Sequence, residues 1–119
     1  MKKHTILIAL ILALTTLLFA ACGGSSIPDG MTQETYDIGT TALDIVTEYN
    51  AGNMDADEAY DRLVECRNEL EALDYSEDDK ADAQRLAIVI SINTCTVEIT
   101  GGDTAFDGER SLKNNLGVE

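Results

Sequence analysis

Residues 55–73, DADEAYDRLVECRNELEAL, carry the most regular apolar spacing in the chain. Small or apolar residues recur there at intervals of 3, 4, 3, 4 and 3, the repeat of one face of an α-helix. Asp55 and Glu58 stand three residues apart at its start, as in a capping box. The segment therefore predicts an amphipathic helix that buries one face. The residues of that face are Ala56, Ala59, Leu63, Cys66, Leu70 and Leu73.

The segment before it, from Thr32 to about Asn50, shows the same helical spacing. Gly52 follows, and glycine tolerates the left-handed conformation that often ends a helix. Gly39 in the middle costs about 1 kcal/mol relative to alanine, so we expect another helix to approach closely there. The small or apolar residues of the predicted face are Thr35, Ile38, Ala42, Ile45 and Tyr49.

A third helix is predicted after a turn at residues 74–76, with Ser76 as its cap and Asp79 three residues later. Nine of the fifteen residues from Leu86 to Thr100 are β-branched, which favours a strand. No partner strand is visible elsewhere in the sequence, and a helical seam persists, so we interpret the segment as a helix. Because it is apolar on more than one side, we expect it to be the central helix. Its seam residues are Ile88, Ile92, Cys95 and Ile99, and its other apolar residues are Leu86, Val89, Ile90 and Val97.

The chain breaks at residues 101–102, both glycine, before a last short helix. Thr104 with Asp107 can cap this helix, and Gly117 can end it. Short connections favour antiparallel neighbours. The prediction for residues 31–119 is therefore an acidic all-α domain, a small antiparallel three-helix bundle whose open end is closed by a short fourth C-terminal helix. The apolar residues predicted in that last helix are Ala105, Phe106, Leu112 and Leu116.

The N-terminal residues 1–21 have the pattern of an export signal. Lys2 and Lys3 are followed by 17 uncharged residues, 5–21, mostly Ile, Leu and Ala. This run is slightly shorter than the roughly 20 residues of a permanent membrane helix, which favours cleavage. An uncleaved membrane anchor is the alternative.

The end of this run, LFAAC at residues 18–22, resembles the lipobox of bacterial lipoproteins. The resemblance implies that Cys22 is linked through a thioether to diacylglycerol and becomes the mature N-terminus. Phe19 stands where lipoboxes prefer leucine, and the alternative is ordinary secretory cleavage beside an incidental cysteine. Residues 22–30 contain glycine, serine and a Pro-Asp-Gly turn, which predicts a flexible tether. The predicted location is the extracytoplasmic face of the cell membrane.

The charge of the chain excludes several functions. It holds 22 acidic and 8 basic residues in 119, a net charge of −14, which opposes binding to a nucleic-acid backbone. Removal of residues 1–21 takes away two lysines and the only histidine, leaving 22 acidic and 6 basic residues and a charge of −16. The mature chain therefore has no histidine for catalysis or metal binding. We expect no enzyme, no cofactor and no specific metal.

A second resemblance covers most of the chain. TALDIVTEY at residues 41–49, Gly52, DADEAY at 55–60 and Leu63 are similar to a pattern in small uncharacterised lipoproteins of Gram-positive, Firmicutes-type gut bacteria. Residues 103–116 are more loosely similar to theirs. The resemblance implies a small helical surface domain, and it brings no catalytic residues with it.

Two cysteines and one acidic loop are the remaining chemical candidates. In an antiparallel pair of helices, Cys66 and Cys95 would differ in level by roughly 15 Å, whereas a disulfide needs Cα atoms within about 7 Å. Buried free thiols are thus favoured over a disulfide, and a reactive nucleophile is least favoured. Residues 74–78, DYSED, have oxygen ligands at alternate positions, but Asp79 and Arg85 replace the Gly and Glu of an EF-hand. We therefore favour helix capping and weak cation association over a calcium site.

Three functions are compatible with these features. The leading hypothesis is a monomeric, membrane-tethered module that binds another protein, for which a basic partner would suit the charge. The alternatives are a structural spacer lipoprotein and a small-ligand-binding domain. A ligand pocket would use the aromatic residues Tyr36, Tyr49, Tyr60 or Phe106.

Overall fold

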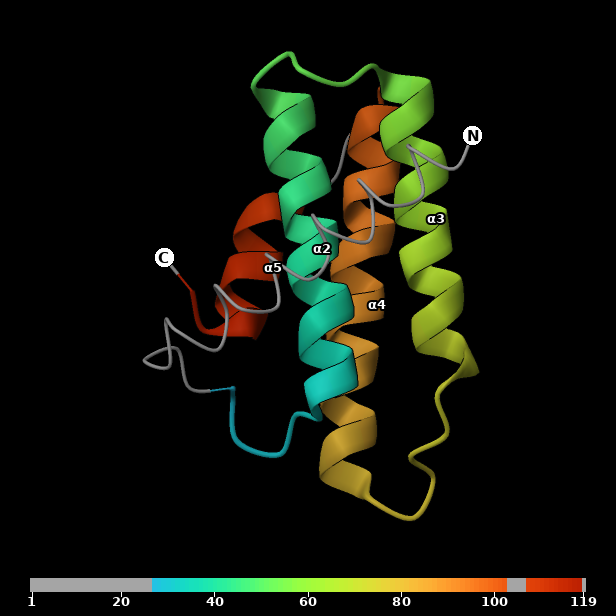
Figure 1. Ribbon diagram of the computed structural model, residues 1–119, viewed down its shortest axis with the longest axis vertical. Coiled ribbons are helices and arrows are strands. Elements are labelled where there is room, and N and C mark those ends of the chain that lie inside the picture. The colour runs from blue at the N-terminus through green and yellow to red at the C-terminus, as the bar shows by residue number, and fades with distance from the viewer. Residues whose placement is uncertain (1–26, 103–106, 119) are drawn as a thin grey trace, which may run out of the picture.

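The computed structural model describes residues 27–102 and 107–118, and these form four helices (Figure 1). Helix α2 spans Gln33–Asn50, α3 spans Ala56–Ala72, α4 spans Asp79–Ile99 and α5 spans Gly108–Leu116. No strand occurs in this part of the chain. The all-α prediction is confirmed, and the β-branched segment before Thr100 is helical because its seam is buried against the other helices.

Each helix begins at a side-chain cap. Thr32 caps α2 and Asp55 caps α3, where Asp55 Oδ1 accepts the Glu58 N–H at 2.8 Å, as the sequence predicts. The predicted starts of the last two helices are wrong. Asp78, not Ser76, caps α4, and Asp107, expected inside the last helix, is itself the cap of α5.

The start of α4 is displaced because the acidic turn uses its own side chains. Asp74 Oδ1 accepts the Ser76 N–H at 3.0 Å, which keeps Ser76 in the turn. Asp78 Oδ1 then accepts the N–H groups of Lys80 and Ala81 at 3.2 and 3.1 Å. A helix can begin only where its first N–H groups find such an acceptor.

Helices α2, α3 and α4 run antiparallel to one another in chain order (Figure 1). The short α5 lies along the side of this bundle, where it contacts α2 and α4. It does not close the end of the bundle, as the sequence analysis expected. Gly39 explains this placement, because a Cβ built there would lie 2.7 Å from Leu116 Cδ2 of α5. The predicted close approach at Gly39 is therefore confirmed.

The core lies where the predicted seams meet. Leu63 and Leu70 of α3 and Ile88 and Ile92 of α4 have no exposed surface. Helix α2 buries a wider face than predicted, including Tyr36 and Val46, because it packs against all three other helices. The remaining large contributors to this core include Ile45, Cys66, Cys95, Ile99, Leu112 and Leu116.

The segment before α2 packs on the bundle from its first described residue. Ile27 contacts the core cluster, and the carbonyl of Asp29 accepts a hydrogen bond from Gln84 Nε2 at 3.1 Å. The Asp29 carboxylate also pairs with Lys80. Residues 27–30, which the sequence analysis assigned to the tether, therefore contact the folded domain. Within the described residues, no helix is long and apolar enough to cross a membrane.

Candidate functional site

The predicted lipid attachment site, Cys22, lies outside the described residues, as do Thr104, Ala105 and Phe106. The signal peptide and its lipobox therefore stay predictions from the sequence. The other residues singled out by the sequence analysis can be placed. They fall into four regions, which are the two cysteines, the acidic turn, the α2–α3 groove and the outer side of α3 and α4.

Cys66 and Cys95 are free thiols, 6% and 1% exposed. Burial raises the pKa of the Cys66 thiol to about 11, assisted by the negative charges of Glu69 and Glu65. Burial likewise raises the pKa of Cys95 to about 12, with Glu98 as the largest charge effect. A nucleophilic cysteine needs the opposite environment, one that stabilises the thiolate. Both residues thus act as small apolar residues of the core, the favoured prediction.

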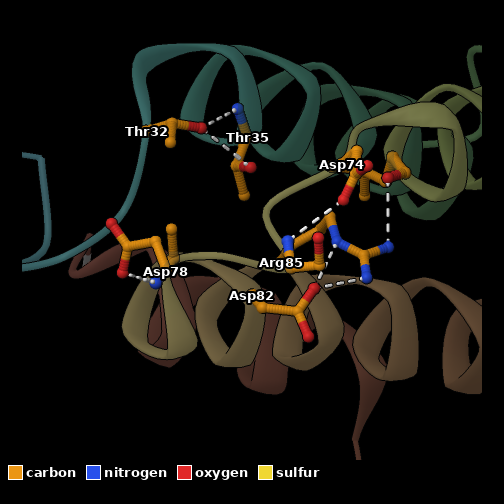
Figure 2. A network of polar contacts seen from close by, with 9 residues as sticks. Thr32, Thr35, Asp74, Asp78, Asp82 and Arg85 are labelled. Atoms are coloured by element: carbon orange, nitrogen blue, oxygen red, sulfur yellow. Dashed lines mark hydrogen bonds and ion pairs between the residues drawn. The ribbon is translucent and has the colours of Figure 1, made fainter.

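The acidic turn at residues 74–78 is held by hydrogen bonds within the protein (Figure 2). The pKa of Asp74 is lowered because its carboxylate accepts hydrogen bonds from Ser76. Asp78 caps α4, so both acidic side chains have structural partners. Among residues 27–102 and 107–118, no three acidic, cysteine or histidine side chains are grouped closely enough to hold a metal ion.

Arg85 ties this turn to the helices on both sides of it (Figure 2). Its Nη1 donates to the carbonyl of Leu70 at 3.2 Å, and its Nη2 donates to Asp82 Oδ1 at 2.6 Å. The first bond supplies a partner for one of the last carbonyls of α3. Across the end of the bundle, the hydroxyls of Thr32 and Tyr75 lie 2.8 Å apart. This polar network therefore has a structural role, which is to fix the α3–α4 connection.

An open groove of about 330 Å³ runs between α2 and α3. Its lining is mixed, with Ile38 and Ile45 beside charged residues from α3. None of the tyrosines expected in a ligand pocket lines it. Tyr36 is buried in the core at 3% exposure, and Tyr60 lies on another side of α3. The full lining is Asp37, Ile38, Thr41, Ile45, Arg62, Glu65, Cys66 and Glu69.

The clearest surface feature is an apolar strip on the outer side of α3 and α4. Helix α4 exposes 44% of Leu86, 64% of Ile90 and 43% of Val97. These three residues follow one another at spacings of four and seven, which places them on one side of the helix. From Leu86 to Val97 the helix carries no charged residue, so this side is uncharged over three turns.

Helix α3 extends the strip across the helix pair. Arg67 Nη1 donates to Asn93 Oδ1 at 3.3 Å, which sets the register of α3 against α4. Tyr60, 40% exposed, lies two turns before Arg67 on the same side of α3, and the half-buried Val64 lies one turn before it. We call the set Tyr60, Val64, Leu86, Ile90 and Val97 the α3–α4 face. It contains every large hydrophobic side chain that is exposed in the described part of the chain.

The third helix, expected to be the central one, is not covered on every side. Helix α4 does contact the three other helices, but α5 has only nine residues and covers the opposite flank of α4. Asn115 Nδ2 and Ser111 of α5 meet Ser91 of α4 at 2.9 and 2.7 Å, on that flank. Among residues 27–102 and 107–118, no helix covers the outer flank of α4 beside α3.

The sequence analysis listed Leu86, Ile90 and Val97 as further apolar residues of the third helix and did not predict an exposed face. A usable signal was present, because Leu86, Ile90 and Val97 fall outside the seam of Ile88, Ile92 and Cys95. A helix with two apolar faces needs either a large protein around it or a partner outside the chain. The arrangement can bind an apolar surface, and it presents no group suited to covalent chemistry.

The chain was also compared with known proteins. Neither the protein-family models, nor the curated proteins, nor the solved structures yielded a match.

Proposed function

We propose that this protein is a lipid-anchored, extracytoplasmic interaction module without catalytic activity, and that it binds a partner protein through the α3–α4 face. The observation that carries the proposal is the exposure of Leu86, Ile90 and Val97 on one uncharged side of α4. A run of exposed apolar side chains on one side is typical of a binding surface.

The N-terminal sequence supports anchoring of this surface at a membrane. Cys22 follows the uncharged run of residues 5–21 and ends the motif LFAAC. Ile27, the first described residue, packs on the bundle and is five residues beyond Cys22. Even a fully extended chain of this length spans only about 18 Å. A lipid on Cys22 would hold the domain, and its α3–α4 face, close to the bilayer.

The anchor is tested by mass spectrometry of the protein extracted from membranes. We expect an N-terminal cysteine carrying diacylglycerol, and a Cys22→Ala variant that is no longer processed at that position. An unmodified soluble chain starting at Cys22, or a chain that keeps Met1, would contradict the anchor. The domain itself should fold equally well in both forms, because the described helices make their own core.

The binding role is tested by placing a photo-crosslinking amino acid at position 90, with position 48 on α2 as the control. Ile90 is central in the α3–α4 face, whereas Glu48 is an exposed residue of another helix. In intact cells, we expect a discrete protein adduct at position 90 that is absent at position 48. A spacer lipoprotein would give no adduct specific to position 90, and that result would refute the proposal.

A further inference from the structure

We infer that the occupant of the α3–α4 face is a short amphipathic helix of the partner, with an apolar stripe flanked by lysine or arginine. This inference rests on the proposed binding function and adds the chemistry of the partner. It follows from the shape of the face, from its length and from the charges around it.

The shape comes from the two antiparallel helices. Their outer sides carry the α3–α4 face, on which Leu86, Ile90 and Val97 form a stripe along α4. The pairing of Arg67 with Asn93 places Tyr60 and Val64 of α3 beside the Val97 end of this stripe. The distance along α4 from Leu86 to Val97 is about 16 Å at the helical rise. That length matches three turns of a helix packed along the stripe, and an amphipathic helix on an apolar surface is a common mode of peptide recognition.

The charge around the α3–α4 face is negative. On α3, Asp57, Asp61 and Glu71 lie within one turn of the apolar residues or of Arg67, and each is exposed. On α4, Asp82 and Arg85 form an ion pair and add no net charge. Arg67 keeps its positive charge because its partner Asn93 is neutral, so the three exposed acids of α3 outnumber it. A cationic flank on the partner would therefore complement this rim.

The same charges argue against a second copy as the occupant. Two mature chains would each bring a charge of −16 to the interface. Stable dimer interfaces bury at least about 1,200 Å² in total, more than four partly exposed side chains provide. Anionic lipid is opposed for the same electrostatic reason.

The test uses the intact lipoprotein in nanodiscs of zwitterionic lipid, with empty nanodiscs as the blank. The probe is a peptide of about four helical turns made of leucine and lysine in an amphipathic pattern. A leucine–glutamate peptide with the same apolar stripe is the first control, and a leucine–lysine peptide of scrambled pattern is the second. We expect saturable, one-to-one binding of the amphipathic cationic peptide alone, weakened by added salt.

Two variants identify the surface that binds. Ile90→Gln should weaken binding about tenfold, because it removes the most exposed apolar side chain of the α3–α4 face. Asp61→Asn with Glu71→Gln should weaken it about three- to tenfold at low salt. Glu34→Gln with Glu48→Gln removes the same charge from α2, on another side of the molecule, and should leave affinity within about twofold.

Several results would overturn the inference. They are equal binding of the acidic peptide, equal loss in the two double variants, no effect of Ile90→Gln, or a dimer in sedimentation that Ile90→Gln converts to a monomer. A cationic peptide that fails to bind, while position 90 still crosslinks a protein in cells, would refute the amphipathic cationic helix and leave the binding function standing. Loss of the crosslink itself would refute the proposed function instead.

Discussion

Gly108, the first residue of α5, provides a sharp test of how this helix is attached to the bundle. A Cβ built on Gly108 would lie 2.5 Å from Cys95 Sγ, 2.9 Å from the Cys95 backbone nitrogen and 3.1 Å from its Cα. Two of these atoms belong to the backbone of α4 and cannot rotate away. Gly108→Ala must therefore move α5 away from α4.

The magnitude follows from two opposing effects. Replacing glycine by alanine in a helix gains up to about 1 kcal/mol. Forcing an extra methyl group into a packed contact typically costs about 1–3 kcal/mol, and a displacement of about 0.5 Å already weakens the van der Waals contacts around it. Because Leu112 and Leu116 on the same short helix are fully buried, they move too. We expect a net loss of about 1–2 kcal/mol in the free energy of unfolding.

The assay is urea unfolding followed by far-UV circular dichroism. Gly39→Ala is the matched control, since its Cβ would meet only the end of the Leu116 side chain below 3.4 Å. That side chain can shift, so the control should change stability by less than the Gly108 variant. Adding Cys95→Ala to Gly108→Ala should relieve the contact with sulfur but not the contact with the backbone. A Gly108→Ala protein as stable as the wild type would refute the close α4–α5 approach.

Three further predictions address the core, the thiols and the charge. Leu70→Ala should lower the free energy of unfolding by about 2–5 kcal/mol, because Leu70 is fully buried. Leu86→Ala should lower it by less than about 1 kcal/mol, because that side chain is 44% exposed. Urea unfolding measures both values. Cys66 and Cys95 should react with a thiol reagent only after unfolding. Their folded-state pKa values of about 11 and 12 exceed the ordinary 9.0, so thiol ionisation favours the unfolded chain, and thermal unfolding should show stability falling as the pH rises above 9.0. Monovalent salt should raise the free energy of unfolding, because it screens the repulsion within a mature chain of charge −16. Calcium should also stabilise the fold by screening, without reaching saturation as it would at a specific site. A stoichiometric calcium titration that Asp78→Ala abolishes would instead establish a metal site.

Local patterns were sufficient to predict most of the helical structure. The seam of α3 and its cap at Asp55 are as the sequence indicated, since both depend on residues within one or two turns of each other. The predicted helix at α4 is also correct, although its many β-branched residues favour a strand. The start of α4 was mistaken because Ser76 and Asp78 are both acceptable caps, and only the turn formed by Asp74 decides between them.

The candidate site was harder to predict than the helices. Leu86, Ile90 and Val97 have the composition of core residues, and periodicity cannot say whether a second apolar side meets another helix or solvent. The position of α5 decides the matter in the described part of the chain, because α5 contacts α2 and α4 and does not cover the flank of α4 beside α3.

The sequence by itself determined the strongly acidic charge, the absence of histidine after residue 21 and the number of helices within the described residues, and it predicts an export signal. These properties depend on composition and on neighbours close in the chain. Only the tertiary structure decided where α5 packs, how deeply Cys66 and Cys95 are buried and which side of α4 faces solvent. Such features arise from contacts between residues far apart in sequence, where the close approaches at Gly39 and Gly108 select one packing among several that the same helices could adopt.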